Sequence, residues 1–323
     1  MPESRHFFLE NTVAYRADGG ESMKTETTLA LLLTLSVGCG PVEEDATSEP
    51  QVPLTQTQAL DSVNSATLNG LAFNGLAVNG LAVNGLAVNG LSSASFSAWF
   101  DQNDTLASMV MRYLVGCAAP AGVTLTHTDT KGRTYVWPGA LGLAPDWASG
   151  QPATVTEQQL VSACLAAHVN KYGRSVAISL QGTNARREPI PTPPEELQEF
   201  SQREGCFFGN LFNGEGLYVG NDDRLLYQNE SSVRACALAH ENNRGDACLP
   251  ILHVGSCAAS CTPDPTGTSY TRCSHNGITY VPLTTRIHRQ DVYRCGDGRC
   301  QFTESCGVGL NTVQCTLDCG VCR

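Results

Sequence analysis

Fifteen cysteines constrain this chain more than any other feature of its sequence. Cys39 stands alone near the start, and the other fourteen all lie in the later part of the chain. Disulfides form and persist in oxidising compartments and are rare in reducing ones. Setting Cys39 aside leaves an even number, enough for seven disulfides. The cysteines predicted to pair are Cys117, Cys164, Cys206, Cys236, Cys248, Cys257, Cys261, Cys273, Cys295, Cys300, Cys306, Cys315, Cys319 and Cys322.

The start of the chain has the layout of a secretory signal. Met23 and Lys24 are followed by a short polar lead-in, an apolar run over residues 29–35 and small residues up to Cys39. The apolar run is shorter than the roughly 20 residues that a membrane-spanning helix needs. Residues 1–22 carry several acidic side chains, so we expect translation to start at Met23. Residues 1–38 are therefore predicted to comprise a segment before the true start codon, because the start was assigned too early, and a signal peptide.

Ser36-Val37-Gly38-Cys39 resembles a bacterial lipobox, in which small residues precede a cysteine that is diacylated and becomes the new N-terminus. The resemblance implies that Cys39 carries a lipid and attaches the chain to a membrane. The alternative is an ordinary signal cleaved near Cys39, which would leave a free or paired thiol.

Two segments without a core of their own follow. Residues 39–67 are acidic and contain three prolines, which predicts a disordered tether. Residues 68–91 repeat every five residues, with Asn-Gly before each leucine, and resemble pentapeptide-repeat solenoids. So few repeats bury little surface, so we predict a flexible Asn-Gly spacer. A short coil docked on the following domain is the alternative. The repeated leucines are Leu71, Leu76, Leu81, Leu86 and Leu91.

Residues 92–289 are predicted to form an α+β body, a small globular domain stapled by disulfides. Helical spacing of apolar residues from Phe96 to Leu114 predicts a helix with Asp104 as an N-cap. Alternating residues predict strands at 123–127 and 133–137. Thr156 with Gln159 suggests a capping box for a second helix reaching residue 172.

The rest of the body is predicted from weaker patterns. A strand is expected at 175–180 and a short acidic helix at 195–203, and the chain from Cys206 onward is expected to be loop-rich. Cys117 and Cys164 are our preferred disulfide because each lies on one of the two long helices. The next six cysteines admit fifteen pairings, and spacing does not choose among them.

Residues 290–323 carry six more cysteines in a segment too short to build a core, so disulfides must hold it together. Cys295-Gly-Asp-Gly-Arg-Cys300, Glu304-Ser-Cys306 and Asp318-Cys319-Gly-Val-Cys322 resemble a small cysteine-rich module of secreted myxobacterial proteins. With its signal and Asn-Gly-Leu repeat, the whole chain resembles the uncharacterised cysteine-rich surface lipoproteins of that group. This resemblance implies a place at the outer membrane or cell surface.

Two candidate metal sites emerge from the sequence. Asp297, Glu304 and Asp318 fall at turns of this C-terminal module and offer the oxygen ligands that calcium prefers. The alternative is that these residues simply form the turns. Zinc at Cys257, Cys261, Cys273 and His275 is the second candidate, but an exported chain favours disulfides there. We expect no other cofactor.

Composition and motifs leave two classes of function. A net charge of −11 without a basic stripe excludes nucleic acid as a partner. No nucleophile elbow, zinc-protease motif or phosphate loop is present. We expect a tethered surface protein that binds an unknown protein or glycan or has a structural role, and an exported hydrolase is the alternative. Exposed Trp137 and Trp147 would favour binding, and a cleft gathering His127, His168 or His240 would favour catalysis.

Overall fold

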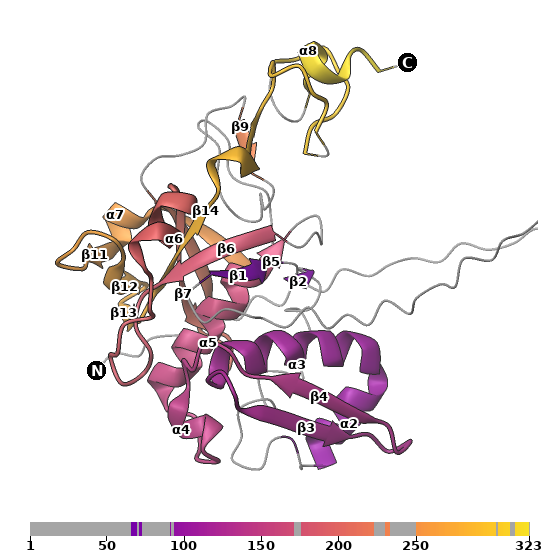
Figure 1. Ribbon diagram of the computed structural model, residues 1–323, viewed down its shortest axis with the longest axis vertical. Coiled ribbons are helices and arrows are strands. Elements are labelled where there is room, and N and C mark those ends of the chain that lie inside the picture. The colour runs from indigo at the N-terminus through magenta and orange to yellow at the C-terminus, as the bar shows by residue number, and fades with distance from the viewer. Residues whose placement is uncertain are drawn as a thin grey trace, which may run out of the picture. The chain divides into compact units, whose positions relative to one another are not determined.

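A computed structural model describes residues 66–69, 71–72, 91, 94–170, 176–222, 230–232, 250–301, 303–310 and 314–322 (Figure 1). The fold is α+β, as the sequence predicts. Cys39 and the predicted tether up to residue 65 lie outside the described residues, as do Cys236 and Cys248. Among the described helices, none has both the length and the apolar character needed to cross a bilayer.

A six-stranded sheet forms the centre of the body. Its order is β1 (Ala66–Asn69), β6 (Val176–Gln181), β14 (Leu283–Ile287), β7 (Gln202–Asn210), β8 (Gly216–Asn221) and β10 (Ile251–Ser256). Neighbouring strands are antiparallel except β8 and β10, which run parallel. The first residues of the Asn-Gly-Leu repeat join this architecture: β1 pairs with β6, and β2 (Leu71–Ala72) pairs with β5 (Val169–Asn170).

The two longest helices lie on one face of the sheet. Helix α5 (Val155–His168) packs across β7, and α3 (Asp104–Ala118) packs on α5. The hairpin of β3 (Thr124–Thr128) and β4 (Thr134–Pro138) lies alongside α3, and α2 (Ala94–Gln102) also packs against that helix (Figure 1). The core between these elements includes Phe100, Leu114, Leu160 and Phe207, all shielded from solvent.

The helix ends differ in detail from the sequence prediction. Asn103, and not Asp104, caps α3, because its side-chain oxygen accepts a hydrogen bond from the backbone N–H of Leu106. The capping box of α5 is formed by Thr154 and Glu157, two residues earlier than predicted. The helix ends at His168, where the chain turns into β5.

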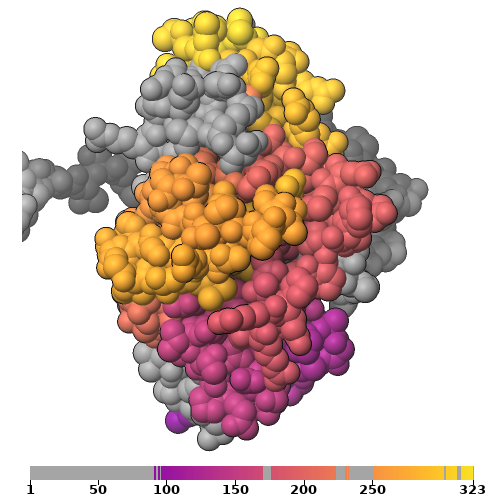
Figure 2. Space-filling model, turned by 90° about the vertical axis from the view of Figure 1, so that its left-hand side faces the viewer, coloured from indigo at the N-terminus to yellow at the C-terminus, as the bar shows by residue number. Residues whose placement is uncertain are grey.

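A second, smaller core lies on the opposite face of the sheet. Strand β7 contributes Phe207 to the helical side and Phe208 to this side, because successive side chains of a strand point to opposite faces. The covering elements are α7 (Cys257–Ser260), β11 (Cys261–Pro263), β12 (Tyr270–His275) and β13 (Ile278–Tyr280). Figure 2 shows this segment in orange on the surface of the body, next to earlier parts of the chain in salmon and magenta.

After Pro193 the predicted short acidic helix is present but ends earlier, and strands follow where loops were expected. Helix α6 covers only Pro194–Glu199, and β7 begins at Gln202. The region after Cys206 was expected to be loop-rich, but it supplies most of the central sheet and the β11–β12–β13 layer. Strands buried on both faces carry no clear alternation of polar and apolar residues, which is why the pattern was missed.

All twelve described cysteines are paired, six of them in the body. Cys117 and Cys164 join α3 to α5, the pair that their positions on two helices predicted. Cys206 pairs with Cys257, and Cys261 pairs with Cys273. Cys257, Cys261 and Cys273, three residues of the zinc alternative, are thus engaged in disulfides, and a sulfur in a disulfide is no thiolate ligand.

Replacing both Cys117 and Cys164 by alanine should lower the free energy of unfolding by about 2–4 kcal/mol, because their disulfide closes a long loop. Denaturant unfolding measures the effect. The matched control replaces Cys261 and Cys273, which are separated by 12 residues instead of 47 and should cost about 1 kcal/mol less. An equal or larger loss in the control would contradict the loop argument.

Tyr270 joins the smaller core to a buried ion pair. Its hydroxyl donates to Asp222 Oδ1 at 2.8 Å, and Asp222 accepts two hydrogen bonds from the guanidinium of Arg203. Burial, together with the hydrogen bond to the Asp222 carboxylate, raises the pKa of Tyr270 to about 12. The folded state therefore favours the neutral phenol over the phenolate.

This raised pKa predicts an alkaline loss of stability. The contribution of Tyr270 should be complete below about pH 10, the pKa of an unfolded tyrosine, and lost as the pH rises towards 12. Tyr270→Phe should lose about 1–2 kcal/mol at neutral pH and should decline less steeply above pH ~10. The free energy of unfolding, measured at neutral pH and above pH ~10, and an ultraviolet titration of the phenols test this. A Tyr270 that ionises near pH 10 would contradict it.

Candidate functional site

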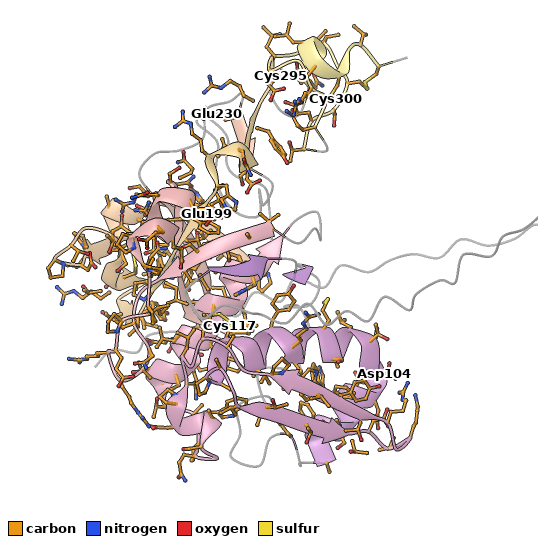
Figure 3. All side chains as sticks on the ribbon, in the orientation of Figure 1. Asp104, Cys117, Glu199, Glu230, Cys295 and Cys300 are labelled. Carbon is orange, nitrogen blue, oxygen red and sulfur yellow. A yellow bond between two sulfur atoms is a disulfide. The ribbon has the colours of Figure 1, made fainter. Side chains whose placement is uncertain are left out.

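The C-terminal module is the site that the sequence singled out, and three disulfides connect it in order. Cys295 pairs with Cys315, Cys300 with Cys319 and Cys306 with Cys322. Cys295 and Cys300 belong to the first half of the module (Figure 3), and their partners flank or end α8 (Thr316–Cys319). Spacing left this pairing open, and the structure decides it.

Asp318 holds the Gly-Asp-Gly turn of the module. Its carboxylate accepts backbone N–H groups from Gly296, Asp297 and Gly298, at 2.5, 3.2 and 2.9 Å. Gly296 and Gly298 have φ of +101° and +86°, a region that side chains rarely adopt. Successive backbone N–H groups in such a turn form a concave site for an anion. The Gly-Asp-Gly motif therefore binds the carboxylate of the Asp318-Cys319 motif, and each motif holds the other in place.

Glu304 is the buried acid of the module. It is only 8 % exposed, and its Oε2 accepts the backbone N–H of Gln301 at 3.1 Å. Its Oε1 is buried and has no hydrogen-bond partner in the part of the chain that the structure describes. Burial raises the pKa of Glu304, and the charges of Asp318 and Asp297 raise it further. The three predicted calcium ligands are therefore close enough for the charges of Asp297 and Asp318 to affect Glu304.

The three predicted ligands differ in their neighbours. Carboxylate oxygens of Glu304 and Asp318 lie within 4.8 Å of each other. Asp297 accepts the backbone N–H of Arg299 at 2.9 Å and the side-chain amide of Gln301 at 2.5 Å. Gln301 was not identified from the sequence, because nothing in its spacing distinguishes it. The Oε1 atom of Gln301 is also buried, with no hydrogen-bond partner among the residues described.

A second candidate site is an open cleft of about 690 Å³ in the body. It is lined by Glu199, Ser201, His288, Arg289 and Gln290, none of which was singled out from the sequence. These residues come from the end of α6 and from the turn after β14, so only the sheet brings them together. Glu199 is labelled in Figure 3.

His288 is fixed by its neighbours in this cleft. Nε2 lies 3.1 Å from Glu199 Oε1, and Nδ1 lies 3.3 Å from Asp291 Oδ2. The ring stacks on Phe200 with centroids 4.2 Å apart. Because carboxylates occupy both nitrogens, neither is positioned to accept a proton from Ser201. Among the described residues, the cleft offers charged and polar groups for binding, and both nitrogens of its histidine face carboxylates.

The two described histidines considered for catalysis, His127 and His168, have different neighbours. His127 is buried among Phe96, Phe100 and Trp137, and its Nδ1 contacts the Leu91 carbonyl at 3.1 Å. His168 is buried beside the Cys117–Cys164 disulfide. His240 lies outside the described residues.

The tryptophans considered for binding are buried. Trp137 is 2 % exposed and donates its indole N–H to Ser108 Oγ, and Trp147 is 7 % exposed. Their apolar rings complete the helical core, so they supply no surface for a partner.

Comparison with known proteins adds no further evidence: neither a protein-family model, nor a curated protein, nor a solved structure matches this chain.

Asp318→Asn should loosen the Gly-Asp-Gly turn, because an uncharged amide accepts fewer and weaker hydrogen bonds from its three N–H groups. Hydrogen exchange of Gly296 and Gly298 should accelerate at least about tenfold, which corresponds to about 1.4 kcal/mol.

Asp264→Asn is the matched control, since Asp264 also accepts backbone N–H groups, from Thr268 and Ser269 in the turn before β12. It should leave exchange in the module unchanged. Unaltered exchange in Asp318→Asn would show that the turn does not depend on this carboxylate.

Proposed function

We propose that this chain is an exported surface protein, attached to a membrane through a lipid on Cys39, with a binding or structural role. The observation that carries the proposal is the complete pairing of the twelve described cysteines. Such a density of disulfides is typical of extracellular proteins. The apolar run before Cys39 and the lipobox-like end of that run support membrane attachment. The outer membrane or cell surface is the proposed location.

The partner we propose is a protein or glycan. The cleft beside His288 combines a carboxylate, a guanidinium and amide and hydroxyl groups, a mixture suited to a polar ligand. Four of the large apolar side chains that the described residues expose lie in the C-terminal module: Val308, Leu310, Leu317 and Val321. Exposed apolar side chains on so small a module support contact with another protein.

A binding role is favoured over the hydrolase alternative by the geometry of the cleft. Both nitrogens of His288 face carboxylates, so the group best placed to act as a base is already engaged. The other histidines considered for catalysis are either buried in the core or outside the described residues.

Cys39→Ser should move the protein from the membrane fraction to the soluble fraction of the exported compartment, because the variant has no thiol to acylate. Fractionation and intact mass of the wild-type protein measure this, and a diacylglyceryl mass on Cys39 is expected. Ser48→Ala, in the same acidic segment, is the control and should remain with the membrane. Wild-type protein without the lipid, or a Cys39→Ser variant that stays membrane-bound, would refute the anchor.

A further inference from the structure

Among the described residues, the C-terminal module contains two buried oxygen atoms with no hydrogen-bond donor. They are Glu304 Oε1 and Gln301 Oε1, a carboxylate oxygen and an amide oxygen. An amide oxygen and an ionised carboxylate oxygen accept hydrogen bonds and donate none, so each requires a proton donor or a cation. A buried acceptor without a partner costs about 1–3 kcal/mol, and more when it carries charge. The backbone N–H of Gln301 donates to Glu304 Oε2, so the two residues are neighbours.

The charges around these oxygens favour a cation. Asp297, Glu304 and Asp318 place three carboxylates in the module, and none of them forms an ion pair with a lysine or arginine among the described residues. Glu304 is more than nine-tenths buried and is repelled by the other two carboxylates. A bound cation would offset both the burial of this charge and the repulsion.

The ligand atoms select calcium among common cations. Cys295 and Cys315 lie next to Glu304 and Asp318, but their sulfurs are joined to each other and cannot serve as thiolate ligands for zinc. The remaining donors are all oxygens. Calcium binds oxygens at about 2.3–2.6 Å, so two of its ligands lie up to about 5 Å apart. Oxygens of Glu304 and Asp318, within 4.8 Å of each other, meet this limit.

Asp318 and Asp297 have additional roles in this arrangement. Asp318 already accepts three backbone N–H groups, which hold its carboxylate in place beside Glu304. Asp297 accepts the side-chain N–H of Gln301, so it orients the amide that carries the unpartnered oxygen. Preorganised ligands of this kind lose little freedom when an ion binds.

We propose that the C-terminal module binds one calcium ion through Glu304, Asp318 and the side-chain oxygen of Gln301, with water completing the coordination. Asp297 positions Gln301 and adds negative charge. The site goes beyond the proposed function, since it requires neither the lipid anchor nor a particular partner.

Calorimetric titration of the full chain with calcium chloride, after removal of divalent ions by a chelator, tests the proposal. One site per chain is expected, with a dissociation constant of about 10⁻⁴–10⁻³ M, the range of extracellular modules. Glu304→Gln, which keeps the shape and removes the charge, should weaken binding at least about tenfold. Glu195→Gln is the control, because it removes one exposed carboxylate on α6 and should bind as the wild type does.

A second variant keeps the test decisive if Glu304→Gln fails to fold, which alkylation and intact mass would reveal through free thiols. Gln301→Glu adds a carboxylate to the proposed ligands and should tighten calcium binding by about tenfold. No saturable binding up to about 10 mM calcium would overturn the proposal. Wild-type affinity in both Glu304→Gln and Gln301→Glu would overturn it as well.

Discussion

Oxidation of the cysteines is the condition on which the rest of this structure depends, but it acts differently in the two parts of the chain. In the body, the Cys117–Cys164 disulfide joins two helices that already share a well-buried core. In the C-terminal module, three disulfides hold a segment with few buried residues. Reduction should therefore weaken the body and unfold the module, because small segments without a core rely on crosslinks.

Strand β7 links the two cores of the body. It pairs with β14 and β8, and it is buried on both faces because α5 covers one side and the β11–β12–β13 layer covers the other. The Cys206–Cys257 and Cys261–Cys273 disulfides lie against each other on that second side. The smaller layer thus combines aromatic packing of Tyr218 and Tyr280 with crosslinks to the sheet.

The two candidate sites differ in how they are assembled. The module builds its site from residues close in sequence, since the Gly-Asp-Gly turn, Gln301 and Glu304 lie within one short loop, and only Asp318 comes from α8. The cleft in the body is assembled from segments far apart in the chain, with Glu199 at the end of α6 and His288 directly after β14. A site whose residues are close in sequence can be predicted from the sequence, and a site built from distant segments cannot.

The sequence by itself determined the α+β class, the β3–β4 hairpin, the helix around Leu114 and the disulfide that joins it to the next helix. Each of these follows from local periodicity or from the placement of residues on a helix face. Only the tertiary structure decided the six-stranded sheet, the pairing within the module and the cleft beside His288. The physical reason is that a strand buried on both faces has no alternating pattern, and that pairing between distant segments depends on a three-dimensional neighbour.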